Sequence, residues 1–279
     1  MAQICCPTAK LERLVLPADG SEFSEGAVRE AINLAKTCSS KLIAIAVIET
    51  NPEYETIAPQ LIEKAGKEAR EHLESVKARA LKEGVDCEII AHQGEEPYRY
   101  IVEEAEKNKA DMIIMGRRGR TGLKRLMMGS ETARTIGHAQ CNVLVVPRAA
   151  KLEFKNILVA TDGSKHSDIA VTEAISIAKR CGSSLTALSV IHSDVDKKCA
   201  EENIKKIKGL AEKEGVKVDA LIAEGRPFEV VVNTAKNKNA DAIVIGSHGR
   251  TALARLLMGS VTERVIGTAE CAVLVVKAK

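Results

Sequence analysis

Two stretches of this chain have the glycine spacing of a loop that could hold a phosphate group. The first is GRRGRTGLKRLMMGS, residues 116–130, and the second is GSHGRTALARLLMGS, residues 246–260. Both have the form G-x2-G-x9-G-S. Because glycine has no Cβ, its backbone N–H can approach an anion closely, and it adopts the positive φ that tight turns need. The spacing therefore predicts two anion-binding loops.

Each loop ends on a serine that we expect to be the N-cap of a helix, with a threonine in the first helical turn. Free N–H groups and the helix dipole favour a phosphate at such an end. The surrounding charge agrees, because the first loop has no acid but has Arg117, Arg118, Arg120, Lys124 and Arg125, and the second has His248, Arg250 and Arg255. We therefore expect polyphosphate cradles formed by Gly116, Gly119, Gly129, Ser130 and Thr132, and by Gly246, Gly249, Gly259, Ser260 and Thr262.

Each motif also has a purely structural interpretation. A lone G-x-x-G is often a turn or a helix C-cap, serine before a helix is often only an N-cap, and duplication alone could preserve a second copy. Asp19 and Asp162 lie in the sequences PADGS and ATDGS. They could form Asx turns, or they could accept hydrogen bonds from a base or ribose. Spacing alone leaves these two roles open.

The chain is an internal duplication. Residues 14–49 align without gaps with residues 157–192, and the second glycine-rich block repeats the first. The first half differs mainly in a longer helical segment around residues 58–83. The sequence therefore predicts two homologous domains, 1–149 and 150–279, joined near PRAAKLEFK.

Short β-branched runs alternate with amphipathic helices in each half. The first half has expected strands near residues 13–18, 41–48, 86–91, 111–115 and 142–147. Alternating β and α elements predict an α/β fold with two doubly wound, five-stranded parallel-sheet domains of strand order 3-2-1-4-5. Ligands bind such sheets where the strand order reverses, between strands 1 and 4. Both the PADGS-type turns and the glycine loops follow these strands.

Composition excludes several classes of partner. The net charge is only +3 and there is no Trp, which argues against nucleic acid as a partner. The longest apolar run, residues 42–48, is far too short to cross a membrane, and no signal peptide is evident, so a cytoplasmic protein is expected. Cysteine spacing predicts no metal site. The repeat-equivalent cysteines are interpreted as small buried hydrophobes, whereas Cys5 and Cys6 fall in an N-terminal tail without an assigned role; the equivalent pairs are Cys38 with Cys181 and Cys141 with Cys271.

These motifs resemble those of the universal stress protein family, in its ATP-binding branch. The resemblance rests on PADGS, ATDGS and the two complete G-x2-G-x9-G-S segments, and it covers residues 11–277. It implies a tandem of two such domains. It also implies that each domain binds ATP, with ADP or AMP as alternatives, and that Mg²⁺ is held through the phosphates.

The resemblance also assigns roles to individual residues. It implies that Asp19 and Asp162 contact adenine and that backbone near Val47 and Val190 lines the adenine pocket. The loop glycines, serines and threonines would hold the ribose and phosphates. Further binding positions at the strand ends and in the loops are Pro17, Ala18, Ala160, Thr161, Arg118, His248, Glu131 and Val261.

The two sites are not identical. Glu131 occupies the position of Val261, and it would place a carboxylate beside bound phosphate, which would weaken that site or make it prefer a different number of phosphates. We therefore expect the second site to bind ATP more strongly. The resemblance further implies that the last strands, residues 142–147 and 272–277, pair antiparallel within the chain, and a homodimer of whole chains stays open.

Three functions remain open from the sequence. The first is a nucleotide-dependent stress-response or regulatory module. The second is a slow Mg²⁺-dependent ATPase or an autophosphorylating protein, although no Walker A motif, kinase signature or identifiable catalytic base is present. The third is an interaction scaffold that does not use nucleotide.

Overall fold

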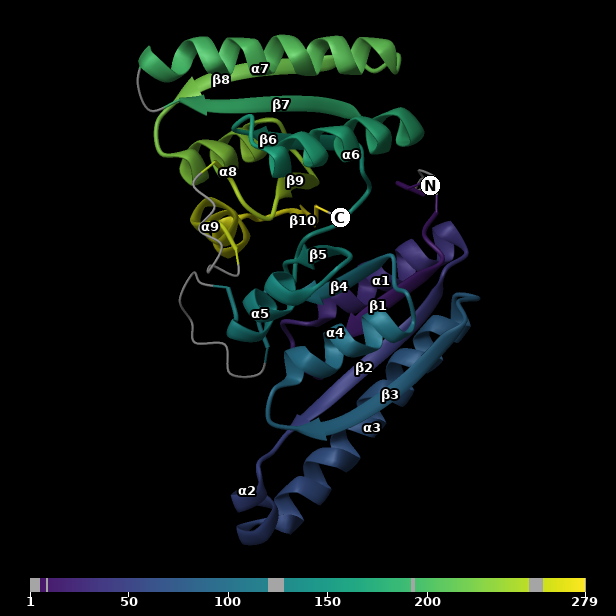
Figure 1. Cartoon of the computed structure of the whole chain (residues 1–279). Helices are drawn as coiled ribbons and strands as arrows, with labels where there is room; N and C mark the ends of the chain where they lie inside the picture. Colours follow the sequence, from purple (N-terminus) through teal and green to yellow (C-terminus); the bar gives the residue numbers. More distant parts are fainter. Residues whose placement is uncertain (1–5, 9, 120–127, 192–193, 251–257, 279) are drawn as a thin grey trace.

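The computed structural model describes residues 6–8, 10–119, 128–191, 194–250 and 258–278. Figure 1 shows two similar halves, one above the other. The first half comprises β1 (Arg13–Pro17), α1 (Glu25–Cys38), β2 (Lys41–Glu49), α2 (Pro52–Ile57), α3 (Pro59–Lys82), β3 (Cys87–Gly94), α4 (Pro97–Lys107), β4 (Met112–Gly116), α5 (Ser130–His138) and β5 (Asn142–Val146). The second comprises β6 (Asn156–Thr161), α6 (Lys165–Cys181), β7 (Ser184–Ile191), α7 (Asp194–Lys213), β8 (Val218–Glu224), α8 (Pro227–Asn237), β9 (Ala242–Gly246), α9 (Ser260–Thr268) and β10 (Ala272–Val276).

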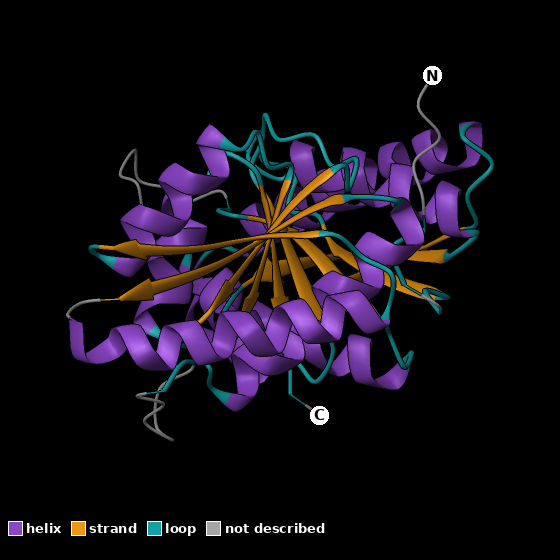
Figure 2. Ribbon diagram, turned by 90° about the horizontal axis from the view of Figure 1, so that it is seen from above, coloured by secondary structure: helices purple, strands orange, loops and turns teal. Residues whose placement is uncertain are grey.

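All these strands form one continuous sheet. Its order is β3-β2-β1-β4-β5-β10-β9-β6-β7-β8, so each half has the expected order 3-2-1-4-5. Within each half the strands are parallel, and the halves join where β5 and β10 pair antiparallel, with Leu144 opposite Leu274. Seen from above, the strands fan out with the accumulated twist of a large sheet, and helices cover both of its faces (Figure 2). The prediction of two doubly wound α/β domains is confirmed.

Alternating side chains build a separate core on each face of the sheet. Leu14 and Leu16 point to the face covered by α1, α3, α6 and α7, whereas Val15 points to the face covered by α4, α5, α8 and α9. The repeat is visible in the helices, because α3 and α7 bury the same stripe: Ala69, Leu73, Val76 and Ala80 in α3, and Ala200, Ile204, Ile207 and Ala211 in α7. Both cores contain residues from both halves, so the two halves share their hydrophobic interior.

The segment that connects the halves is also part of the core. Leu152 and Phe154 are buried there, and Phe154 is 1% exposed with a positive φ of 51°. The Arg29 guanidinium donates to the carbonyl groups of Arg148 and Ala150. These contacts bind the connection to α1, so it is a packed junction.

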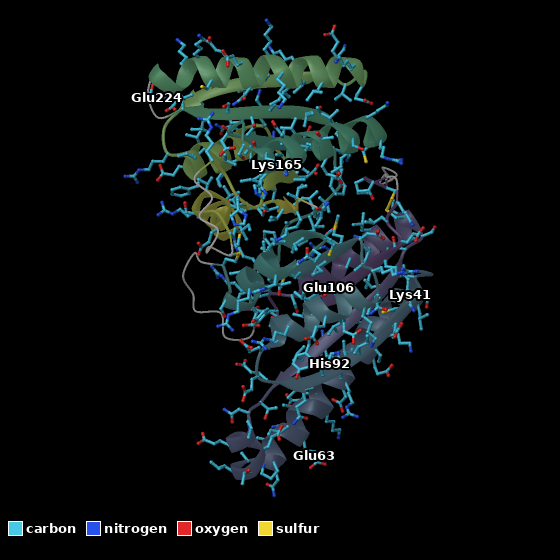
Figure 3. All side chains as sticks on the ribbon, in the orientation of Figure 1. Lys41, Glu63, His92, Glu106, Lys165 and Glu224 are labelled. Atoms are coloured by element: carbon cyan, nitrogen blue, oxygen red, sulfur yellow. A yellow bond between two sulfur atoms is a disulfide. The ribbon has the colours of Figure 1, made fainter. Side chains whose placement is uncertain are left out.

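Charged side chains cover the outer faces of the helices (Figure 3). The N-terminal part of α3, where Glu63 lies, extends beyond the sheet and away from the second half (Figures 1 and 3). Ile57 and Leu61 are 80% and 62% exposed at this tip. Among the described helices, none has the length and apolarity needed to cross a membrane.

One interpretation of the cysteines is wrong. Cys38 is not simply a small hydrophobe, because it forms a disulfide with Cys6, with 5.0 Å between the Cα atoms. The bond attaches the N-terminal segment to the end of α1. Cys5 lies outside the described residues. Cys141, Cys181 and Cys271 are only partly buried, but they pack against the hydrophobic cores. Burial raises the pKa values of Cys141 and Cys271 to about 11, so these two thiols stay protonated near neutral pH.

We expect the junction between β5 and β10 to be essential for stability. Leu274 is fully buried in a core shared by both halves, so Leu274→Ala should lower the free energy of unfolding by about 2–5 kcal/mol. Urea unfolding followed by circular dichroism measures this change. Leu81→Ala is the control, because Leu81 is 57% exposed, and it should change the free energy by no more than about 0.5 kcal/mol. Equal effects of the two substitutions would contradict the shared core.

Candidate functional site

The two candidate sites lie where the strand order reverses in each half. In the first half β1 ends at Pro17 beside β4, which ends at Gly116. In the second half β6 ends at Thr161 beside β9, which ends at Gly246. Parallel strands end at a common edge, so the PADGS-type turn and the glycine loop meet there in both halves.

A pocket of about 290 Å³ opens at this edge of the first half. Every residue that the sequence analysis assigned to the first site lines it: Pro17, Ala18, Asp19, Val47, Gly116, Arg118, Gly119, Gly129, Ser130, Glu131 and Thr132. The sequence analysis anticipated the wall at the end of β2, near Val47, but not the two helical walls. These come from Ala65 and Ala69 of α3 and from Pro97 and Ile101 of α4. Two alanines four residues apart in the expected helical segment 58–83 were the sequence signal for a helix that packs close to the site.

The residues assigned to the second site occupy the equivalent elements. Ala160, Thr161 and Asp162 stand at the end of β6, and Val190 lies near the end of β7. Gly246 closes β9, and His248 and Gly249 follow it. Gly259, Ser260, Val261 and Thr262 form the start of α9. Part of each loop, including Arg120, Lys124, Arg125 and Arg255, lies outside the described residues.

Both aspartates form the Asx turns that were one of their two interpretations. Asp19 Oδ1 accepts hydrogen bonds from the Ser21 N–H at 3.0 Å and the Ser21 hydroxyl at 2.8 Å. Asp162 Oδ1 accepts from the Ser164 N–H at 3.0 Å, and its Oδ2 accepts from the Arg250 N–H at 2.8 Å. Burial works against ionisation of Asp162, but the hydrogen bonds from Ser164 and Arg250 outweigh it and lower the pKa. The ionised carboxylate therefore connects the turn after strand 1 to the glycine loop.

The first glycine of each motif is required by the fold, and the second leaves room for the aspartate that follows strand 1. A Cβ at Gly116 would lie 2.8 Å from the Phe23 carbonyl oxygen, and a Cβ at Gly246 would lie 2.8 Å from the His166 backbone. At Gly249 it would lie 2.6 Å from Asp162 Oδ2, and at Gly119 it would lie 2.9 Å from the corresponding oxygen of Asp19. These glycines let the segment after strand 1 pack directly against the loop.

The third glycine is different, because the described residues leave room for a Cβ there. Gly129 and Gly259 have an ordinary φ of −69°, and the nearest atom of the described residues to a Cβ at either would be 3.4 Å away. They, rather than Ser130 and Ser260, are the N-caps of α5 and α9, so the expected cap is wrong by one residue. Propensity favours serine as a cap, but here the glycine carbonyl accepts the first intrahelical bond, from the N–H group of Ala133 or Glu263.

The helix N-termini face the sites with free donors. Because the first intrahelical donor of α5 is the Ala133 N–H, the N–H groups of residues 130–132 have no acceptor within the helix. The Thr132 and Thr262 hydroxyls are buried and donate to the carbonyl oxygens of Gly116 and Gly246, at 3.1 and 2.8 Å. These threonines therefore tie the helix to the end of strand 4, and the serine side chains are exposed.

Glu131 has a partner within the first half. Its Oε2 accepts a hydrogen bond of 2.9 Å from the Tyr98 N–H at the start of α4, and Arg134 lies 3.8 Å from its other oxygen. The carboxylate thereby caps a helix while it lines the pocket. Val261, its repeat equivalent, packs against the core instead.

Arg117 does not join the cationic cradle. Its guanidinium points to the other half, where it donates to the carbonyl oxygens of Gly267 and Ala269, both at 3.0 Å. Among the described arginines of this loop, Arg118 lines the pocket. Sequence spacing alone gives no signal for this difference, because it depends on which helix the other half brings alongside.

Two histidines and a serine form a cluster in the second site. The Ser247 hydroxyl is buried and lies 3.1 Å from His248 Nδ1 and 3.4 Å from His166 Nδ1. The two rings are 5.2 Å apart. His166 comes from the start of α6, and the sequence analysis did not assign it to the site, because it follows Asp162 in a stretch without a recognisable motif. At the positions of His166 and His248, the first half has Phe23 and Arg118.

This combination of fold and site defines a tandem α/β protein with a helix N-terminus and a glycine loop at each strand-order reversal. Sequence comparison agrees, because the profile of the universal stress protein family matches residues 10–147 and 153–277. The chain therefore belongs to the universal stress protein family.

Individual relatives are similar to one half or to the whole chain. A universal stress protein of Methanocaldococcus jannaschii is 40% identical over 148 residues, which cover 50% of this chain and 84% of that protein. One from Synechocystis is 31% identical over 149 residues, covering 48% of this chain and 96% of that protein. The crystal structure of a universal stress protein from Archaeoglobus fulgidus is similar over 96% of this chain and 99% of that chain, with a TM-score of 0.79 and 25% identity.

The histidine cluster makes stability depend on pH. Burial lowers the pKa of His166 below its usual 6.5, His248, Lys165 and Lys277 lower it further, and Asp162 opposes them. The unfolded chain consequently binds a proton that the folded chain does not, and this costs stability as the pH falls below about 6.5. We expect His166→Gln to flatten the loss of stability between about pH 7 and pH 5, measured by urea unfolding. His138→Gln, at an exposed histidine, should leave that slope unchanged. If His166→Gln did not reduce the dependence of the unfolding free energy on pH, the assignment of this dependence to His166 would be wrong.

Proposed function

We propose that both halves of this protein bind ATP at the glycine loops and that it acts as a nucleotide-dependent stress-response or regulatory module. The observation that carries the proposal is the third glycine. Among the described residues, no atom would lie closer than 3.4 Å to a Cβ at Gly129 or Gly259. A glycine at a helix N-terminus where the described residues leave room for a Cβ is well explained by the close approach of a ligand phosphate.

The described residues fit such a ligand. The N–H groups of residues 130–132 would donate to phosphate oxygens, and Arg118 in the first site or His248 in the second would add positive charge. The apolar part of the first pocket, between Val47 and Ala69, suits an adenine ring. Asp19 and Asp162 would hold the turn beside the base, and one carboxylate oxygen of each would be near enough to the loop to orient it.

Mg²⁺ would enter with the phosphates. The described residues contain no group of three or more His, Cys, Asp or Glu side chains that could hold a metal ion by themselves. Phosphate oxygens are the usual main ligands of Mg²⁺ in nucleotide sites, and water completes the coordination. The proposal therefore requires no metal site in the protein, and ADP or AMP would occupy the same cradle with fewer phosphate contacts.

The second site should bind ATP more strongly than the first. Glu131 adds a negative charge to the first pocket, although its hydrogen bond with the Tyr98 N–H and its proximity to Arg134 moderate that charge. At the same position the second site has Val261. The difference predicts unequal affinities for the same ligand.

We assign the two binding units to residues 1–149 and 150–279. Bound nucleotide can regulate such a protein only if it prefers one conformation or assembly over another. A homodimer of whole chains would be one such assembly. Slow hydrolysis or autophosphorylation would require an additional group that activates water or a hydroxyl.

Nucleotide binding can be tested at each site with one small substitution. We expect Gly259→Ala to abolish or weaken ATP binding in the second half by at least tenfold, about 1.4 kcal/mol, because the added methyl group would lie where the phosphates approach. Gly129→Ala should do the same in the first half. Isothermal titration calorimetry of nucleotide-stripped protein with Mg·ATP gives the affinity and the number of sites.

Gly209→Ala provides the matched control. Gly209 lies within α7 with no protein atom within 4 Å of its Cβ position, so ATP binding should be unchanged. Thermal unfolding would verify that all variants fold. Absence of binding to the unmodified protein would overturn the proposal and leave the scaffold function. Steady release of phosphate that is lost in both glycine variants would instead support the ATPase.

A further inference from the structure

Each phosphate-binding helix is held at its far end by a cation from the other half. Arg117 Nη1 donates to the Gly267 and Ala269 carbonyl oxygens at the end of α9, both at 3.0 Å. Lys277 Nζ donates to the Ile136 and Gly137 carbonyl oxygens near the end of α5, at 2.6 and 3.3 Å. Cations at helix C-termini stabilise the helix and complement its dipole. The two contacts are chemically equivalent, but they do not come from equivalent positions of the repeat.

The antiparallel junction accounts for this arrangement. Because β5 and β10 run in opposite directions, the helix before β10 ends beside the carboxyl ends of β4 and β5. Arg117 follows β4 there. Likewise, Lys277 follows β10 and lies beside the start of β5, where its own N–H donates to Asn142 Oδ1 at 3.0 Å. Each cation therefore spans the junction between the halves.

Arg117 contacts both phosphate-binding helices. Its carbonyl oxygen accepts the N–H of Gly129, the N-cap of α5, at 3.0 Å. Its guanidinium meanwhile holds the C-terminus of α9, whose N-terminus forms the second site nine residues away. Arg117 thus connects the N-cap of α5, at the first site, to the C-terminus of α9, the helix of the second site.

A second path runs in the opposite direction. The Ser247 carbonyl oxygen accepts a hydrogen bond of 2.9 Å from the N–H of Gly259, which is the N-cap of α9. The Ser247 N–H in turn donates to the Val276 carbonyl oxygen at 3.3 Å. Val276 directly precedes Lys277, which holds the end of α5. The N-cap of each helix is therefore connected to the C-terminal end of the other helix by backbone hydrogen bonds and one cationic side chain.

We infer that Arg117 and Lys277 are positioning residues that couple the two nucleotide sites, so that ATP bound in one half raises the affinity of the other. This inference rests on the proposed function. Phosphate at the N-terminus of α5 fixes Gly129 and, through it, Arg117. The helix α9 is then held in place before its own ligand arrives, and the second binding event loses less conformational freedom. Thermodynamic linkage requires the same factor in both directions.

The coupling can be measured by comparing single-site and two-site binding. Gly129→Ala and Gly259→Ala each leave one working site and give its affinity alone. We expect the intact protein to bind the second Mg·ATP at least fivefold more tightly than these single-site affinities predict, within the usual range of coupling between sites. Calorimetric titrations of the intact protein and both variants provide the comparison.

Arg117→Ser tests the role of the arginine. Serine is the residue that the second half has at this position, Ser247, so the substitution introduces a side chain that the repeat already accommodates. The variant should still bind two equivalents of ATP, but the coupling factor should fall below that of the intact protein, because only the path through Lys277 remains. Arg117→Lys should retain more of the coupling, because an ammonium group can contact two carbonyl oxygens, as Lys277 does. A substitution that only damaged the structure would weaken ATP binding at the sites. It would not change the factor by which the second ATP binds more tightly than the single-site affinity predicts.

Arg226→Ser is the matched control, because the Arg226 side chain is 78% exposed and should leave the coupling unchanged. The inference would be overturned if the intact protein bound ATP at two independent sites, or if Arg117→Ser retained full coupling. These results differ from failure of the proposed function, in which the intact protein would not bind ATP at either site.

Discussion

The antiparallel pairing of β5 with β10 is the contact on which the rest of the structure depends. It turns two five-stranded sheets into one and lets both hydrophobic cores extend across the junction. It also covers two apolar strand edges that would otherwise be exposed to pairing with other chains. The packed connection through Phe154 strengthens the same junction. The halves therefore share their cores, and the C-terminal ends of α5 and α9 are each held by a residue from the other half.

The glycine motif combines structural and binding requirements that a sequence pattern does not separate. Its first glycine makes room for the backbone after strand 1, and its second makes room for the strand 1 aspartate. Among the described residues, the third has no such contact. Asx turns at Asp19 and Asp162 are likewise part of the scaffold and stand at the edge of the candidate sites. The scaffold thus uses most of the motif to hold the loop in place, and the third glycine is the position on which the proposal of nucleotide binding depends.

The two halves have diverged around a common geometry. In the first half Arg134 lies 5.5 Å from the Tyr98 ring centre, and in the second Arg264 lies 5.1 Å from that of Phe228. The charge in the sites differs more, since Arg118 and Glu131 correspond to His248 and Val261. The cations that hold the helix C-termini have diverged furthest, because they come from different strand ends. Equivalent contacts were retained while the residues that make them changed.

The sequence by itself determined the duplication, the strand order and the edge of the sheet where the sites lie, because hydrophobic periodicity and repeated spacing are local properties of the chain. It also identified the first-half residues that line one pocket. Only the tertiary structure decided that Arg117 leaves the cradle, that Glu131 caps α4, that His166 joins His248, and that Cys6 pairs with Cys38. Each of these contacts depends on which distant segment of the chain packs beside the residue. That neighbour is determined by how the strands pair and the helices pack in three dimensions.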